Sequence, residues 1–536
     1  MGVDEGDSGV CLAELIAALS LGTDLGLGQP VEHVLRMCVL ALGLAERLGL
    51  DESERSVVYY VALLAWVGCC ADSFEQARWF GDDIAARADY YPADLVGLNK
   101  ARFVVRHVGA GETPVRRART AIEFLVTGRQ AIESMRGTHC VIAGDLARRL
   151  TLGEAVRAAL GEVFERWDGK GDPGRLAGAD ISLPVRLVQL ADVVEVFNRE
   201  GGVAAAVAVA QERSGAQFDP GVVECFCEGA DELLAPLASE TSWGVVIGAQ
   251  PGLGDPLLDG ELDAALEAIA DFADLKSPYT MGHSRGVADL SSEAGRDAGL
   301  SEAELRVVRR AALVHDLGRL GISNAIWDKR GPLTAVERER VRLHPYLTER
   351  MLSASPRLAP LGALAAHHHE RLDGSGYPAG LKASMLSPQA RILAAADVYR
   401  ALIEPRPHRD ARSAGEAAAE LRTDARAGRL DGDAVEAVLR AAGHVTTRRP
   451  ERPAGLTPRE VEILRLLARG LANKQIARRL EITTKTVGNH IEHIYAKIGV
   501  SSRAAAGLFA TEHGLLAFAG GADIPPGVAA RVGDAR

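Results

Sequence analysis

The stretch HERLDGSGYPAGLKASMLSPQARILAAADVYRAL, residues 369–402, has a counterpart earlier in the chain, FERWDGKGDPGRLAGADISLPVRLVQLADVVEVF, residues 164–197. The two match without a gap at a constant offset of 205 positions. The matched identities are Asp373 with Asp168, Gly374 with Gly169, Gly376 with Gly171, Pro378 with Pro173, Arg391 with Arg186, Asp397 with Asp192 and His344 with His139. A shorter similarity upstream pairs His283 with His33. A repeat of this length indicates two copies of one domain.

The copies differ where side chains able to bind a metal occur. Aligning AWVGCCADS (65–73) with ALVHDLGRLG (312–321) sets His315 and Asp316 against Gly68 and Cys69. Likewise, His368 and His369 face Val163 and Phe164. About 42 extra residues separate Gly68 from His139, an insertion that could serve sensing or dimerisation. The pattern indicates that the first copy kept the fold and lost the site.

The composition is that of a globular protein with several domains. Of 536 residues, 47% are apolar and 25% are charged. Abundant Ala, Leu and Arg favours helices. The net charge of −11 excludes nucleic-acid binding over the whole surface, although one small domain could still bind it. We therefore predict an all-α fold of tandem helical bundles with a small C-terminal four-helix domain.

Pro- and Gly-rich stretches divide the chain into segments. Such stretches occur at 248–263 and 441–455. The predicted segments are 1–245 (the degenerate copy), 256–442 (the copy with ligands), 443–455 (a linker), 456–520 (the small domain) and 521–536 (a tail).

No feature of the sequence indicates export or a membrane span. The N-terminal residues MGVDEGDSGV are acidic, whereas a signal peptide begins with basic residues. The most apolar run, 57–70, is shorter than the roughly 20 residues that a bilayer needs. The seven cysteines are too few for a disulfide scaffold in this length. We expect a cytoplasmic protein without a membrane partner.

Seven side chains of the second copy are candidate metal ligands. Imidazole and carboxylate ligands without a thiolate suit iron, manganese, nickel or zinc. The adjacent pair His315–Asp316 ends an apolar helical run and could offer one ligand to each of two ions. Singly, His344 could be a surface residue and 367–369 a solvated loop; together, seven of fourteen histidines lie between 283 and 408. The candidates are His283, His315, Asp316, His344, His368, His369 and Asp397.

These motifs, HDLGRLGI, RLHPYLTERML, HHERLDGSGYP, RILAAADVYRAL and PRPHR, resemble the HD-GYP branch of the HD-domain phosphohydrolases over about 274–439. The resemblance implies an all-helical domain that holds two or three iron-type or manganese ions and hydrolyses cyclic di-GMP. It implies the seven ligands above, with His367 as an extra residue, and catalytic roles for His315, Asp316 and Arg319. It also implies that Gly376, Tyr377 and Pro378 cradle the nucleotide while Arg406 and Arg409 meet its phosphates.

Three positions depart from the family pattern. Tyr279 stands where members often have a glutamate, which favours a site for two divalent ions over three. Arg319 stands where a lysine is usual, and Arg400 where an aspartate is usual. These two departures place the details of substrate binding in doubt.

Residues 455–516 carry local signals for a helix-turn-helix. Thr457 and Glu460 form a capping box before a helix that Gly470 ends. A short helix is expected at 474–480 and a longer one from 483 or 484 to Ile498. Nine Lys or Arg against five Asp or Glu give this segment a net charge of +4, as phosphate binding requires. The alternative is a helical dimerisation domain.

LTPREVEIL, GLANKQIA, KTVGNHI and KIGVSSRA in this segment are similar to the LuxR-type helix-turn-helix. The similarity implies DNA binding as a homodimer, through 456–520. Gly488 stands where many members have a lysine. The candidate DNA-contacting residues are Lys474, Lys485, Thr486, Asn489 and His490.

Three functions fit these features. The chain could be a metal-dependent phosphodiesterase, acting on cyclic di-GMP or a related nucleotide, joined to a transcriptional regulator. It could be a transcription factor whose HD-GYP-like domain only senses a nucleotide or metal. It could also be a phosphohydrolase that the DNA-binding domain localises.

Overall fold

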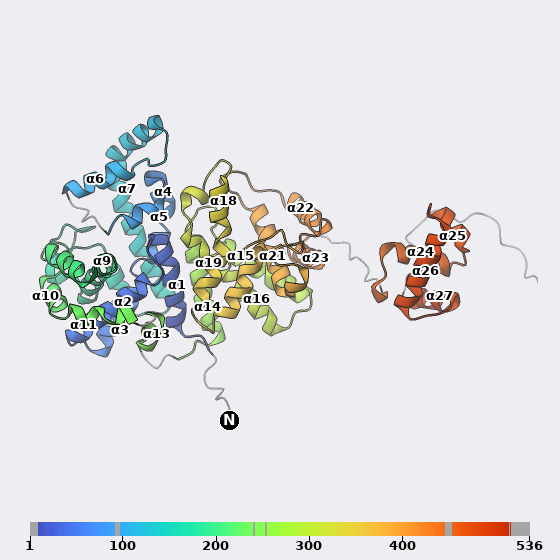
Figure 1. Ribbon diagram of the computed structural model, residues 1–536, viewed down its shortest axis with the longest axis horizontal. Helices are drawn as coiled ribbons and strands as arrows, with labels where there is room; N and C mark the ends of the chain where they lie inside the picture. The colour runs from blue at the N-terminus through green and yellow to red at the C-terminus, as the bar shows by residue number, and fades with distance from the viewer. Residues whose placement is uncertain are drawn as a thin grey trace, which may run out of the picture. The chain divides into compact units, whose positions relative to one another are not determined.

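The computed structural model describes residues 9–91, 97–239, 242–251, 255–444, 453–513 and 515. These residues form helices and turns with four isolated β-bridges and no strand, which confirms the all-α prediction. The chain divides into two compact units, residues 1–446 and 447–536 (Figure 1). The predicted tail and residues 445–452 of the predicted linker lie outside the described residues.

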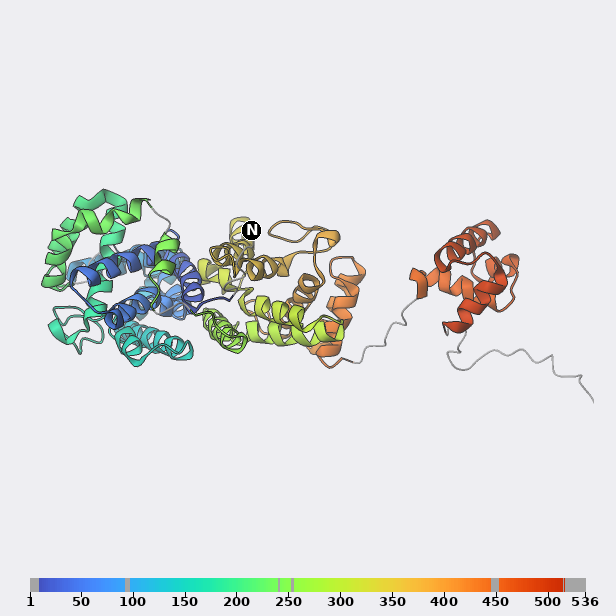
Figure 2. The same cartoon turned by 90° about the horizontal axis from the view of Figure 1, so that it is seen from below.

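The first unit consists of two lobes, which Figure 2 shows side by side, blue to green and yellow to orange. The first lobe, residues 9–251, contains α1 (Leu12–Leu27), α2 (His33–Arg47), α3 (Glu52–Leu64), η1 (Val67–Cys70), α4 (Ser73–Phe80), α5 (Asp83–Ala88), α6 (Gly97–His107), α7 (Pro114–Arg149), α8 (Glu154–Leu160), η2 (Gly178–Asp180), α9 (Leu183–Glu212), α10 (Pro220–Glu228), α11 (Ala230–Leu234), α12 (Pro236–Ser239) and α13 (Ser242–Gly248). The second lobe, residues 255–444, contains α14 (Asp259–Asp274), α15 (His283–Asp297), α16 (Glu302–Val314), η3 (Leu317–Gly321), α17 (Asn324–Trp327), α18 (Ala335–Arg342), α19 (His344–Leu352), α20 (Ala359–Ala365), η4 (Ala366–His369), η5 (Ala383–Met385), α21 (Pro388–Ile403), α22 (Ala414–Arg426) and α23 (Gly432–Ala441).

Corresponding helices of the two lobes begin at constant offsets. Helices α2 and α15, and α3 and α16, begin 250 positions apart, while α8 and α20, and α9 and α21, begin 205 apart. Helices α3 and α16 also begin with the same motif, a capping box, which Asp51 and Glu54 form at α3 and Ser301 and Glu304 form at α16.

The loop before α9 and α21 is fastened in the same way in both lobes. Glu165 accepts hydrogen bonds from the backbone N–H groups of Gly174 and Arg175. Glu370 accepts them from Ala379, Gly380 and Leu381. The Asp-Gly loop is therefore closed by a buried glutamate in both lobes, including the one without the candidate ligands.

The structure corrects one pairing between the lobes. A Cβ on Gly68 would overlap His139, and a Cβ on Gly318 would overlap His344, so these two glycines occupy equivalent places. His315 and Asp316 therefore correspond to Ala65 and Trp66, and the predicted pairing with Gly68 and Cys69 is wrong by three positions. The predicted pairing followed the Ala-x-Val residues that the two stretches share. The glycine decides the pairing instead, because only glycine lets the backbone lie this close to the histidine. The insertion accordingly has 45 residues rather than 42.

The insertion forms α4 to α7 and has a small hydrophobic core of its own. Trp79, Phe80 and Phe124 pack edge-to-face at ring-centroid distances of 5.4 and 5.8 Å. Helix α7 runs from this subdomain into the main core, where it carries His139.

The lobes are joined through α1 and through a buried polar network. Helix α1 packs on η3 and α19 of the second lobe. Asp83 of α5 accepts hydrogen bonds from Ser323 Oγ at 2.7 Å and from the Asn324 backbone N–H at 2.9 Å. Arg87 Nη1 lies 3.2 Å and Lys276 Nζ 3.9 Å from the other Asp83 oxygen. Burial raises the pKa of Asp83, but Lys276, Arg87 and these hydrogen bonds outweigh burial and lower it.

In the described residues, no single helix has the length and apolarity to cross a membrane. One bent pair, Glu52–Cys70 with Ser73–Phe80, meets these criteria jointly, by length and composition alone.

The second unit contains η6 (Pro453–Gly455), α24 (Pro458–Ala468), α25 (Asn473–Arg479), α26 (Thr484–Ile498) and α27 (Arg503–Glu512) around its own core. Thr457 and Glu460 form the predicted capping box, and Gly499 ends α26 in the left-handed conformation with φ 68°. The three helices with predicted limits are confirmed to within one or two residues, and α27 is the fourth helix of the predicted four-helix domain.

We predict that Asp83→Ala lowers the free energy of unfolding of the first unit by about 3–5 kcal/mol, because it leaves Lys276 and Arg87 buried without their carboxylate. The pKa of Asp83 is lowered, so its contribution is complete at neutral pH and is lost as the pH falls through that pKa. Urea unfolding followed by circular dichroism measures the change. Asp145→Ala, which removes an exposed partner of Arg148, serves as the control and should change stability by less than about 0.5 kcal/mol.

Candidate metal centre

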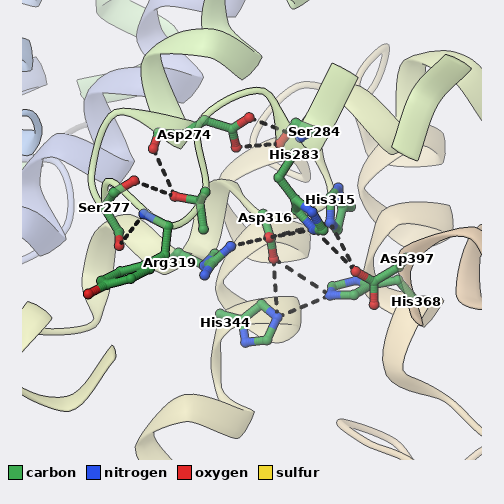
Figure 3. Close-up of polar contacts among 12 residues, drawn as sticks. Asp274, Ser277, His283, Ser284, His315, Asp316, Arg319, His344, His368 and Asp397 are labelled. Carbon is green, nitrogen blue, oxygen red and sulfur yellow. Dashed lines mark hydrogen bonds and ion pairs between the residues drawn. The ribbon is translucent and has the colours of Figure 1, made fainter. Parts of the chain in front are cut away.

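Five segments of the second lobe bring the seven candidate ligands together. His283 begins α15, His315 and Asp316 join α16 to η3, and His344 begins α19. His368 and His369 lie in η4, and Asp397 lies in α21. Figure 3 shows six of these side chains converging on one another from different helices. Each of the seven belongs to at least one group of three residues whose ligand atoms all lie within 4.8 Å of one another.

Three of the histidines stand where a helix ends, and this position orients their rings. His315, His344 and His368 each place Nδ1 2.6–2.7 Å from the backbone carbonyl oxygen three residues earlier. The last carbonyls of a helix lack an intrahelical partner, so each ring donates its Nδ1–H there. The lone pair is consequently on Nε2, the atom that faces the cluster.

The Nε2 atoms lack partners suited to their lone pairs. His344 Nε2 and His368 Nε2 lie 3.0 Å apart, and both are hydrogen-bond acceptors in this tautomer. His315 Nε2 is buried without a hydrogen-bond partner. Asp316 lies among them, with Oδ1 3.4 Å from His344 Nε2 and Oδ2 3.4 Å from His315 Nε2. Acceptors gathered in this way fit a divalent cation, and the nitrogen and oxygen donors suit the iron and manganese class.

The electrostatics favour neutral histidines at one side of the cluster. Burial lowers the pKa of His344 to about 4. Burial and the neighbouring His315 and His344 lower the pKa of His368 to about 3. Burial likewise holds the pKa of His369 well below its usual value. These imidazoles are neutral at pH 7, which is the form that binds a metal.

The other side of the cluster holds the charge. Burial opposes ionisation of Asp316, but Arg319, whose Nη1 lies 2.6 Å away, and His315 keep the pKa of Asp316 well below its usual value. Burial lowers the pKa of His283, whereas hydrogen bonds to Asp397 and Glu404 outweigh burial and raise it to about 9.

The ligand atoms form overlapping groups rather than one shell. One group is His283, His315 and Asp397, and another is His344, His368 and His369. Asp316 belongs with His315 and His368 in a third group, between the first two. Two cation positions that share Asp316 are compatible with this arrangement.

In the first lobe, rings occupy the equivalent space. Trp66, His139 and Phe164 pack together at centroid distances of 4.8–6.2 Å. His139 Nε2 lies 2.7 Å from the carbonyl oxygen of Ala65, so this histidine donates from the atom that His344 directs toward the cluster.

A cavity of about 260 Å³ opens onto the ligands and is lined by residues predicted to bind substrate. Arg319 lines it and lies over the ring of Trp327 at 4.2 Å. Arg406 lines it and donates to the carbonyl of Tyr279 at 3.0 Å. Arg409 also lines it, but its Nη atoms donate to the carbonyls of Ala401, Leu402, Glu404 and Asp410.

The predicted nucleotide loop lies beside the ligands. The Tyr377 ring contacts the His369 ring at a centroid distance of 4.7 Å, and Pro378 is exposed. A Cβ on Gly376 would overlap the backbone of Glu370 and Arg371, as a Cβ on Gly171 would overlap Glu165 in the first lobe. Gly376 therefore serves the shape of the loop.

In the second unit, α26 buries Val487, Ile491 and Ile494 and turns another face outward. Lys485 and Asn489 are exposed on that face, and Lys474 is exposed on α25. Thr486 donates its backbone N–H to Thr483, and His490 is half-buried. A helix with such a free polar face after a short turn is the geometry of a recognition helix.

Comparisons with known proteins assign families to both units of the chain. The family model of the HD domain matches residues 267–434, and that of bacterial regulatory proteins of the luxR family matches 454–510. The chain is 34% identical over 404 residues, 75% of its length, to 3'3'-cGAMP-specific phosphodiesterase 3 of Vibrio cholerae, of which it covers 88%. The chain belongs to the HD-domain phosphodiesterases. Members of this family are metal-dependent phosphohydrolases, and the C-terminal unit is a LuxR-type DNA-binding domain.

Two further relatives fit this membership. A crystal structure of a cyclic GMP-AMP-specific phosphodiesterase from V. cholerae superposes with a TM-score of 0.57 at 30% identity, covering 82% of this chain and 99% of that one. The cyclic di-GMP phosphodiesterase response regulator of Xanthomonas campestris is 43% identical over 145 residues, 26% of this chain and 38% of its own length.

Sequence reasoning missed three residues of the phosphodiesterase site. Glu404 lies 2.8 Å from His283 Nδ1. Trp327 lines the cavity beneath Arg319. Thr348, on α19, contacts the turn that contains His315 and Asp316. Thr348 Oγ1 accepts from the Gly318 N–H at 2.8 Å and donates to the His315 carbonyl at 3.0 Å. No local motif marks Glu404 or Thr348, because their contacts join residues at least 30 positions apart.

We predict that His344→Gln weakens Mn²⁺ binding to the phosphodiesterase by more than about 100-fold, since losing a ligand exceeds the 10–100-fold cost of losing an outer-sphere partner. Electron paramagnetic resonance of free Mn²⁺ measures the affinity. His139→Gln is the matched control, because His139 holds the same place in the first lobe and donates from its Nε2 atom. Equal Mn²⁺ affinity for His344→Gln and the wild type would contradict the assignment.

Proposed function

We propose that the chain is a bifunctional regulator, in which the second lobe hydrolyses a cyclic dinucleotide at a centre of two divalent ions and the second unit binds DNA. The observation that carries the hydrolytic part is the convergence of the Nε2 atoms of His315, His344 and His368 around Asp316, with that of His315 unpartnered and those of His344 and His368 facing each other at 3.0 Å. A domain that sensed a nucleotide without turnover would not need this set of ligands.

The relatives guide the choice of substrate. The relative matched over 75% of this chain is named for 3'3'-cGAMP, while those named for cyclic di-GMP match about a third of it or less. We propose 3'3'-cGAMP as the first substrate to test and cyclic di-GMP as the second.

The roles of individual residues follow from their places. Two ions bound here would activate water and stabilise the charge that develops on the phosphoryl group. Asp316 would bridge them, with the remaining six ligands divided between the two sides. Arg319, held by Asp316 and stacked on Trp327, directs a fixed positive charge toward the cavity. Arg406 and Arg409 line the wall where a second phosphate would lie, and Tyr377 offers a ring for a base.

We predict metal-dependent hydrolysis of 3'3'-cGAMP that falls at least about 100-fold in Asp316→Asn, because the change removes a charged ligand from the middle of the cluster. Chromatographic detection of linear products with Mn²⁺ or Fe²⁺ measures it. Asp192→Asn, at the position in the first lobe that matches Asp397, is the control and should retain activity. Tight nucleotide binding with no turnover by the wild type would instead support a sensor.

The second unit would bind DNA through α26 entering the major groove, with Lys485 and Asn489 toward the bases or phosphates and Lys474, Thr486 and His490 alongside. A homodimer remains part of the proposal, as the similarity to LuxR-type domains implies. The proposed domain limits remain 1–245, 256–442 and 456–520, with the first segment an HD-type copy that lacks the metal ligands.

We predict that Lys485→Ala weakens DNA binding across sequences and lowers the salt slope by about one, as expected for a phosphate contact. Gly488→Lys should strengthen binding, because a Cβ there meets open space, the helix gains up to about 1 kcal/mol, and a positive charge is added. Fluorescence anisotropy over a salt series measures both. Unchanged affinity in both variants would exclude this face of α26.

A further inference from the structure

His283 is held differently from the other histidines of the centre. It begins α15, and the carbonyl oxygen of Thr280, three residues earlier, already accepts the backbone N–H of His283 at 3.0 Å. The Nδ1 atom lies instead 2.8 Å from Glu404 Oε2. The Nε2 atom faces the cluster, 3.3 Å from Asp397 Oδ1 (Figure 3).

Glu404 is in turn held by two arginines. Arg406 Nη2 donates to Glu404 Oε2, the oxygen that contacts His283, at 3.2 Å. Arg400 Nη2 lies 2.9 Å from Glu404 Oε1, the oxygen that does not contact His283. Arg400 lies on the last turn of α21, and Glu404, four positions later, is the first residue after that helix. The glutamate side chain is only 14% exposed. A His–Glu–Arg chain therefore leads outward from the metal centre.

The first lobe contains the same chain built from other positions. His33 Nδ1 lies 2.5 Å from Glu195 Oε2, and Arg36 Nε lies 2.6 Å from Glu195 Oε1. His33 Nε2 lies 3.0 Å from Asp192, as His283 Nε2 lies near its counterpart Asp397.

The arginine and the carboxylate that support the histidine stand at different positions of the repeat in the two lobes. The position of Arg36 is Gly286 in the second lobe, and the position of Glu195 is Arg400. A Cβ on Gly286 would overlap the Arg400 guanidinium, so the glycine makes room for the arginine that has moved to the other helix. Glu404 restores the carboxylate one helical turn later. Retention of the contacts despite exchange of both residues indicates that the histidine requires them.

We infer that Glu404 is a positioning residue for the metal centre, and that Arg400 holds Glu404 in place. Glu404 accepts the Nδ1–H of His283 and so keeps that proton on Nδ1. When a metal displaces the Nε2 proton, the lone pair is left on Nε2, the atom that faces Asp316 and Asp397. The inference rests on the proposed metal centre. It also gives Arg400, which departs from the family pattern, a role in supporting that centre.

The test is Mn²⁺ affinity of the full-length chain, measured by electron paramagnetic resonance after removal of bound metal. Glu404→Ala should weaken binding by about 10–100-fold, the usual effect of removing an outer-sphere partner. Glu404→Gln, which keeps the volume, should give a smaller loss of the same sign and serves if the alanine variant melts abnormally. Glu195→Gln removes the same contact in the first lobe and should leave Mn²⁺ affinity within about twofold.

A transplant of the first-lobe arrangement provides the rescue. Gly286→Arg with Arg400→Glu, added to Glu404→Ala, places the arginine and the carboxylate where Arg36 and Glu195 stand. Mn²⁺ affinity should return to within about fivefold of the wild type, a recovery that a merely structural role of Glu404 would not produce.

The outcomes separate this inference from the proposed function. Mn²⁺ affinity unchanged in both Glu404 variants would overturn the positioning role while leaving the metal centre intact. A folded triple variant with no recovery would overturn the His–Glu–Arg chain. If the wild type bound no Mn²⁺, Zn²⁺ or Fe²⁺, the proposed metal centre itself would fail.

Discussion

The metal centre depends on one recurring hydrogen bond, from a histidine Nδ1–H to a carbonyl oxygen three residues earlier at a helix end. Helix ends offer carbonyls that no backbone N–H reaches, and these carbonyls fix the ring and its tautomer together. Because three helix ends meet inside one lobe, three oriented lone pairs meet there as well. Packing of α16, α18 and α20 thus determines where the three lone pairs point, since moving any of these helix ends would turn its lone pair away.

The sequence predicted the parts of this protein that local rules govern. The capping box at Thr457 and the glycine at 499 defined helices of the second unit, because each acts within one turn. The candidate metal ligands stood out in the sequence because four of the seven, His315, Asp316, His368 and His369, are replaced by other residues in the first copy of the repeat. The register at Gly68 was missed, since it depends on contact with His139, which is 71 positions away.

Glu404 shows a second kind of information that the sequence does not display. Glu404 follows His283 by 121 positions in the sequence. The glutamate that makes the equivalent contact in the first lobe, Glu195, stands at a different position of the repeat. Alignment sets Glu195 against Arg400, which reads as a charge reversal beside the site. Only the three-dimensional arrangement indicates that the carboxylate has moved one turn along α21.

In the first lobe, the packed rings of Trp66, His139 and Phe164 fill the place that corresponds to the metal centre, so this part of its interior consists of side chains alone. Removal of transition metals by a chelator would therefore not change the packing of the first lobe. In the second lobe it would leave the Nε2 acceptors of His344 and His368 facing each other. Since α1 and Asp83 bind the lobes together, the metal-independent lobe can hold its neighbour in shape until an ion arrives.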